Sequence, residues 1–150
     1  KKGYEANGKT YKVHIDGYDM TPYLSGDAEE HSRPGFIYFT DDGDVAALRY
    51  NNWKFVFMEQ ESKGTLYLWM NPFKTLRIPK IFNLRTDPFE YADITSNTYY
   101  DFILRHEFMF APAQKLVGDF LQTFEEFPPR QKAASFSLDQ VLEKLQAGIR

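Results

Sequence analysis

The chain has 150 residues, no cysteine, and 21 acidic against 18 basic residues, which gives a formal net charge of −3. This length suits one domain with its own hydrophobic core, and the lack of cysteine excludes disulfides and thiolate metal sites. No basic run could follow a nucleic-acid backbone and no apolar run approaches the roughly 20 residues that span a bilayer, so we expect neither partner.

The first predicted element is a half-buried strand over residues 10–15, where apolar and polar side chains alternate. Asp19 is placed to cap a short helical turn, and Gly26 is placed to end it. Residues 25–35 are polar and contain glycine, proline and acids, which is typical of an exposed connector.

Antiparallel strands follow this connector. Residues 36–40 and 45–50 predict two strands separated by an acidic turn at residues 41–44. Asn51-Asn52 can supply both left-handed residues of a two-residue hairpin, because asparagine tolerates positive φ. The next strand is therefore expected to return over residues 53–60.

The sheet is expected to continue after a turn at residues 61–64. Strands are predicted over residues 65–70 and 81–85, with a proline-bounded loop over residues 71–79 between them. Pro88, preceded by Thr86 and Asp87, indicates a helix start or a turn.

Helical periodicity replaces alternation after Asn97. An apolar stripe continues to Pro128-Pro129, and Pro112 is expected to kink or restart the helix. Ser137 and Gln140 resemble a capping box that opens a last short helix through Leu145. Strands followed by helices predict an α+β fold, with a small antiparallel sheet of about four strands packed by C-terminal helices.

Three sequence motifs stand in series along the chain. They are Asp16-Gly17-Tyr18-Asp19-Met20-Thr21-Pro22-Tyr23-Leu24-Ser25-Gly26, Ala47-Leu48-Arg49-Tyr50-Asn51-Asn52-Trp53-Lys54 and Ile81-Phe82-Asn83-Leu84-Arg85-Thr86-Asp87-Pro88-Phe89-Glu90. In this order and spacing the chain resembles the C-terminal domain of bacterial arylsulfatases, in the sulfatase family of the alkaline-phosphatase-like superfamily. Each motif alone is weakly specific, whereas three in series form a strong signal, and the resemblance covers nearly the whole chain.

The resemblance implies three segments and a role that is not catalytic. Residues 1–26 would be the junction from an absent catalytic domain, residues 27–127 the sulfatase C-terminal subdomain, and residues 128–150 a tail with a short helix. In the family the catalytic residues precede the junction, and this chain has neither Ser-x-Pro-x-Arg nor Ser-x-Ala-x-Arg. We therefore assign no catalytic residue and expect the chain alone to be inactive.

Cofactors and location also follow only from the resemblance. The parent enzyme is implied to use calcium and a formylglycine nucleophile, and neither is expected in this part of it. The implied partner is the chain's own N-terminal catalytic domain. Bacterial members of the family are often periplasmic, which is the location that the resemblance implies.

One loop is a candidate substrate rim. In related sulfatases the loop that corresponds to residues 59–73 approaches the mouth of the active site. The rim groups that this suggests are Glu61, Lys63, Trp69 and Lys74. Trp69 would stack on an aryl or sugar ring and the lysines would attract sulfate. The alternative is an ordinary exposed hairpin with a core tryptophan.

Other polar clusters favour structural roles. Asp41, Asp42 and Asp44 lack the alternating spacing and final glutamate of a calcium loop, so a solvated turn is expected and no metal site is assigned. His14, His31 and His106 have no partner four residues away to form a ligand pair, which predicts surface or packing roles.

Two other functions remain open. The 14 Phe, 10 Tyr and 2 Trp residues form either an aromatic core or a face made for a partner. In the second case the chain is a free-standing protein-interaction module, and it would form homo-oligomers through its exposed aromatic face. An unrelated small α+β enzyme would need titratable side chains that converge in a cleft.

Overall fold

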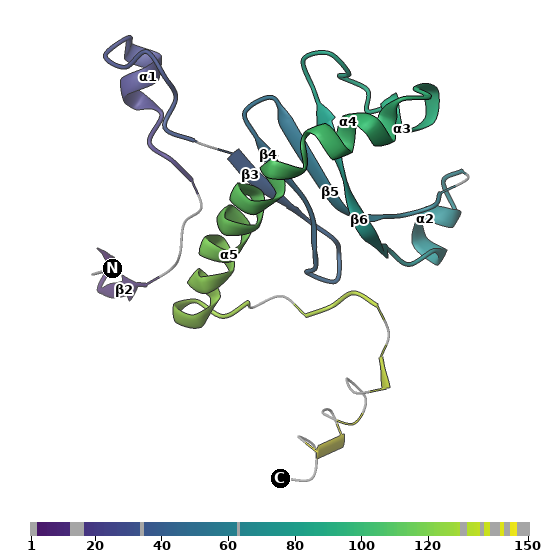
Figure 1. The fold of residues 1–150 in the computed structure, drawn as a ribbon. Helices are drawn as coiled ribbons and strands as arrows, with labels where there is room; N and C mark the ends of the chain where they lie inside the picture. The colour runs from purple at the N-terminus through teal and green to yellow at the C-terminus, as the bar shows by residue number, and fades with distance from the viewer. Residues whose placement is uncertain are drawn as a thin grey trace.

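The computed structural model describes residues 3–12, 17–33, 35–62, 64–129, 132–135, 137–138, 142 and 145–146. It confirms the α+β fold, because its centre is a four-stranded antiparallel sheet with helices packed on it (Figure 1). The strands, in order across the sheet, are β3 (Gly35–Phe39), β4 (Val45–Tyr50), β5 (Trp53–Glu59) and β6 (Lys74–Asn83).

The helices are mostly short, apart from the one that crosses the sheet. They are α1 (Thr21–Ser25), α2 (Tyr67–Met70), α3 (Ala92–Thr95), α4 (Tyr99–Arg105), a 3₁₀ turn η1 (Glu107–Met109) and α5 (Phe110–Glu126). Pro112 is the third residue of α5, where a missing N–H costs nothing, so the expected restart of the helix is confirmed. Within the described part of the chain, each helix is too short or too polar to cross a bilayer.

The hairpin between β4 and β5 forms where it was expected. Tyr50 pairs with Trp53 and leaves Asn51-Asn52 as a two-residue loop. Asn51 is left-handed at φ 52°, but Asn52 does not have a positive φ. The preceding acidic turn is also confirmed, since the Gly43 N–H donates to the Thr40 carbonyl over 3.1 Å.

Two expected elements are wrong. Residues 65–70 were expected to be a strand, but residues 67–70 form the single helical turn α2. A short apolar run fits either structure, and here no neighbouring strand pairs with it. Residues 71–79 were expected to be a loop, but β6 begins at Lys74. Pro79 is tolerated because β6 is an edge strand whose register with β5 shifts between Val56 and Met58.

The N-terminal segment forms a separate hairpin. The expected strand over residues 10–15 corresponds only to β2 (Lys9–Tyr11), which pairs with β1 (Tyr4–Ala6). Tyr11 is exposed, so the expectation of half-burial is wrong there, and residues 13–15 lie outside the described residues. Gln140, half of the expected capping pair of the last helix, also lies outside them.

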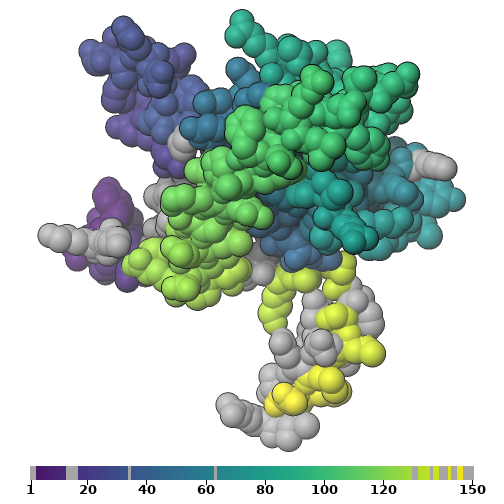
Figure 2. All heavy atoms as spheres, viewed as in Figure 1, coloured from purple at the N-terminus to yellow at the C-terminus, as the bar shows by residue number. Residues whose placement is uncertain are grey.

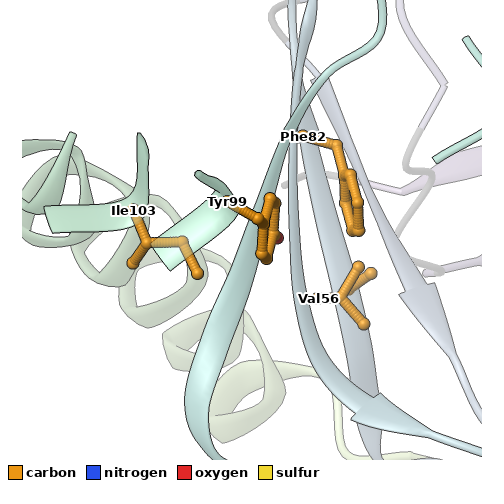
Figure 3. Packing of buried hydrophobic residues seen from close by; sticks show 5 residues of the cluster. Val56, Phe82, Tyr99 and Ile103 are labelled. Carbon is orange, nitrogen blue, oxygen red and sulfur yellow. The ribbon is translucent and has the colours of Figure 1, made fainter. Parts of the chain in front are cut away.

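The core lies between the sheet and the two longer helices. Leu48, Phe55 and Ile81 form one buried cluster with Ala113 of α5, whose small side chain lets the helix lie close to the sheet. A second cluster joins the sheet to α4, and Figure 3 shows the rings of Tyr99 and Phe82 facing each other beside Val56. Their ring centroids are 5.7 Å apart.

Two peripheral segments extend from this body. Figure 2 shows the described N-terminal residues in purple and the C-terminal tail in yellow beyond the sheet and helices. The tail is tied back to the turn between β3 and β4, because the Ser135 N–H donates to a carboxylate oxygen of Asp42 over 2.6 Å. This hydrogen bond lowers the pKa of Asp42 and gives that turn residue a structural role.

Candidate functional site

The second and third sequence motifs meet in space. Lys54 lies on β5, and its ammonium group lies 2.6 and 2.7 Å from the two carboxylate oxygens of Glu90, which is 36 residues away in sequence. The same ammonium group lies 5.0 Å from the centre of the Tyr38 ring, within cation–π range. Lys54 therefore bridges the sheet and the loop that follows β6.

Backbone contacts reinforce this junction. The Leu84 N–H donates to the Asn52 carbonyl over 2.7 Å, which links the β4–β5 hairpin to the end of β6. The Asp87 carboxylate accepts hydrogen bonds from the N–H groups of Tyr91 and Ala92. The turn that carries Glu90, which itself has a φ of 59°, is held by these contacts. Only a firmly constrained turn keeps a glutamate in that conformation.

Trp53 connects the same unit to α4. Its ring stacks on Phe102 at a centroid distance of 6.2 Å and contacts the His106 ring at 5.3 Å. His106 is held in turn by a 2.7 Å hydrogen bond between its Nδ1 and the Phe102 carbonyl. The packing role expected for His106 is confirmed.

The first motif forms the helical turn that was expected of it. The Asp19 carboxylate accepts the Thr21 N–H over 2.9 Å, and this contact lowers the pKa of Asp19. Gly26 ends α1 in the left-handed conformation at φ 87°. His31 lies edge-on to Tyr23 at 6.0 Å, a packing contact, whereas His14 and Asp16 lie outside the described residues.

The structure brings only part of the predicted rim together. Glu61 and Lys74 form an ion pair at 3.3 Å, and Trp69 lies on α2 in the segment between them. Trp69 is 86% exposed, so the alternative of a core tryptophan is wrong. Lys63 lies outside the described residues.

The segment that carries Trp69 is braced at its base. The Gln60 amide donates to the carbonyls of Leu68 and Asn71, and the Asn71 amide donates to the Glu61 carbonyl. Leu66 and Met70, near Trp69 in sequence, are also largely exposed, at 77% and 75%. An apolar tip on a braced base can stack on a flat ring or insert into an apolar recess of a partner.

Sequence reasoning missed a second charged cluster on the sheet. Lys80 contacts Glu59 and Asp93, both at 2.5 Å. Burial alone would lower the pKa of Lys80, but its hydrogen bonds with Asp93 and Glu59 outweigh that effect and raise it. Alternating strand patterns could not reveal the cluster, because Asp93 belongs to α3 and reaches Lys80 only through the folded chain.

Lys54, Glu59, Glu90 and Asp93 line an open hollow of about 490 Å³ on the sheet. Its acids are engaged by lysines, Glu90 by Lys54 and both Glu59 and Asp93 by Lys80. Among the residues that the structure describes, no group of three or more His, Asp or Glu side chains could hold a metal ion. The acids of the hollow are thus paired with lysines, whereas Asp93 Oδ1 is buried without a hydrogen-bond partner among the described residues. Acids held in ion pairs suit packing more than acid–base chemistry.

Comparison with known proteins adds no assignment. No family model matches the chain, and no curated protein matches it either.

Proposed function

We propose that the chain is the C-terminal subdomain of an arylsulfatase-like sulfuric ester hydrolase. It supports the catalytic domain of that enzyme and forms one wall of its substrate pocket. The observation that carries the proposal is the contact between Lys54 and Glu90, the last residues of two motifs quoted for the resemblance. The contact supports the proposal because it joins two of the motifs on which the resemblance rests.

Chemistry belongs to the other part of the parent enzyme under this proposal. In the N-terminal catalytic domain, a formylglycine nucleophile would attack the sulfate ester. Calcium in that domain would stabilise the negative charge of the sulfate group. The present chain would provide structural support to that domain as the C-terminal subdomain of the enzyme. Separated from that domain, it is expected to self-associate through apolar surface that the domain would cover.

The coding sequence upstream of Lys1 provides the first test. We expect it to encode, in frame, a Cys-x-Pro-x-Arg motif or its serine variant, and we expect the purified 150-residue chain to release no product from a chromogenic aryl sulfate. An upstream frame without such a motif would overturn the sulfatase assignment. Hydrolysis of the aryl sulfate by the pure chain, with contaminating enzyme excluded, would overturn the proposal that catalysis resides in the N-terminal domain alone.

The proposal that this chain forms one wall of the substrate pocket is tested by Trp69→Ala in the full-length parent enzyme. Loss of one stacking contact of about 0.5–1.5 kcal/mol should raise KM for an aryl sulfate roughly twofold to tenfold, with kcat nearly unchanged. A small alkyl sulfate provides the control, because it presents no ring and its KM should stay the same. Equal effects on both substrates, or none on either, would remove Trp69 from the pocket and leave the sulfatase assignment intact.

A further inference from the structure

The two edge strands of the sheet, β6 and β3, differ in the features that prevent an edge strand from pairing with another chain. The β6 edge carries Lys74, Pro79 and Lys80, and its register with β5 is interrupted. At the buried end of β6 the Tyr99 hydroxyl accepts the Ile81 N–H and donates to the Ile81 carbonyl. Lysine, proline, irregular register and a covering group are the means by which proteins prevent edge strands from pairing with other chains.

The β3 edge has almost none of these protections. Its sequence, Gly-Phe-Ile-Tyr-Phe, contains no charge and no proline. Its register with β4 shifts only between Tyr38 and Phe39, which leaves Gly35–Tyr38 regular. On its other side, β3 has no neighbouring strand within the described part of the chain. Such an edge is a template for an added strand.

A cleft beside this edge has room for the side chains of an added strand. It holds about 640 Å³ and lies between β3 and α5, and Gly17, Tyr18 and Arg33 also contribute to its lining. Its lining is mainly apolar and includes Phe36, Ile37 and Phe39 of β3 and Leu116 and Phe120 of α5. One face of an incoming strand could be buried there, which a bare edge alone would not provide.

We propose that β3 pairs antiparallel with β3 of a second copy of this chain, with Ile37 near the two-fold axis. An antiparallel pair of identical strands is compatible with two-fold symmetry, and uncharged strands place no like charges opposite each other. This inference concerns the chain itself and does not rest on the sulfatase assignment.

Charge complementarity at the strand ends favours a second copy as the occupant. With Ile37 opposite Ile37, antiparallel counting places Arg33 of one copy opposite Asp41 of the other. Two-fold symmetry repeats that pair at the other end. The ion pairs among the described residues include neither Arg33 nor Asp41. The Arg33 guanidinium lies 5.0 Å from the centre of the Phe36 ring. The proposed pairing assigns Arg33 and Asp41 to each other across the two-fold axis.

The proposal is tested by exchanging the charges at Arg33 and Asp41 and measuring the dimer Kd by sedimentation equilibrium. The wild-type chain should show a reversible monomer–dimer equilibrium between roughly 1 μM and 1 mM, a range typical of weak association. Arg33→Glu should raise the dimer Kd roughly tenfold, because both symmetric attractions become repulsions, and the double change Arg33→Glu with Asp41→Arg should restore it. Arg77→Glu on β6 is the matched control and should leave the Kd unchanged.

A second readout uses the lack of native cysteine. Ile37→Cys creates the only thiol in the chain, and mild oxidation should link two copies at the two-fold axis. Ile78→Cys on β6, an exposed position, should remain unlinked under the same conditions. The proposal is overturned by a monomer at every concentration, by a dimer that Arg33→Glu leaves intact, or by equal linking at positions 37 and 78.

Discussion

Replacing Ile81 by alanine is expected to lower the free energy of unfolding by about 2–5 kcal/mol, the largest effect that we predict for a single substitution. Ile81 is 0% exposed and belongs to the cluster that joins β4 and β5 to Ala113 of α5. Removing three carbons there forfeits their burial and leaves a cavity. The strands around it are held by their ladder hydrogen bonds and cannot collapse to fill the space.

Ile78→Ala is the matched control for this prediction. It removes the same atoms from the same strand, but Ile78 is 62% exposed, so the loss should stay below about 1 kcal/mol. Urea unfolding followed by far-ultraviolet circular dichroism measures both values, with equal m-values required for the comparison. Similar losses for the two variants would mean that the contact between α5 and the sheet is not the main core.

The sequence predicted the elements that local pattern determines. Residues 45–50 were expected as a strand and β4 has those bounds, because both its ends are set by turn residues. The restart of the helix at Pro112 and the end of α1 at Gly26 were predictable for the same reason. Glycine and proline act through their own backbone conformations, which tertiary packing seldom changes.

The prediction failed where tertiary contacts decide the outcome. Residues 71–79 contain two prolines and were expected to be a loop, yet β5 provides a partner for Lys74 and Thr75. Residues 67–70 have strand-like composition, yet the amide of Gln60 binds the carbonyl of Leu68 and stabilises a helical turn. Both outcomes depend on residues that are distant in sequence, which no local pattern encodes.

The candidate site shows the same division. The motifs were visible in the sequence, whereas the contact of Lys54 with Glu90 required the fold, because nothing in the spacing indicates which acid a lysine will meet. Trp69 was named as a rim residue, but the exposed apolar neighbours Leu66 and Met70 were not. A run of apolar residues without alternation was the available signal, and it predicts a buried strand equally well.

Tyr99 connects this sheet to α4 by a hydrogen bond pair that phenylalanine cannot make. Its hydroxyl accepts the Ile81 N–H at 3.2 Å and donates to the Ile81 carbonyl at 3.0 Å, and the residue is buried. Tyr99→Phe keeps the ring stacked on Phe82 but leaves a buried donor and a buried acceptor without partners. We expect a loss of about 2–3 kcal/mol in the free energy of unfolding.

The pH dependence distinguishes this hydrogen bond pair from simple packing. Burial raises the pKa of the Tyr99 hydroxyl above its ordinary value of 10.0. The unfolded chain therefore releases this proton first as the pH rises, so the contribution of Tyr99 is complete below pH 10.0 and declines above it. The difference in stability between the wild type and Tyr99→Phe should narrow above that pH.

Tyr100→Phe is the control, because Tyr100 is 78% exposed. Its free energy of unfolding should stay within about 0.5 kcal/mol of the wild-type value at neutral pH. A loss at Tyr99→Phe no greater than this control, or one independent of pH up to the alkaline limit of folding, would show that the sheet edge does not depend on the hydroxyl.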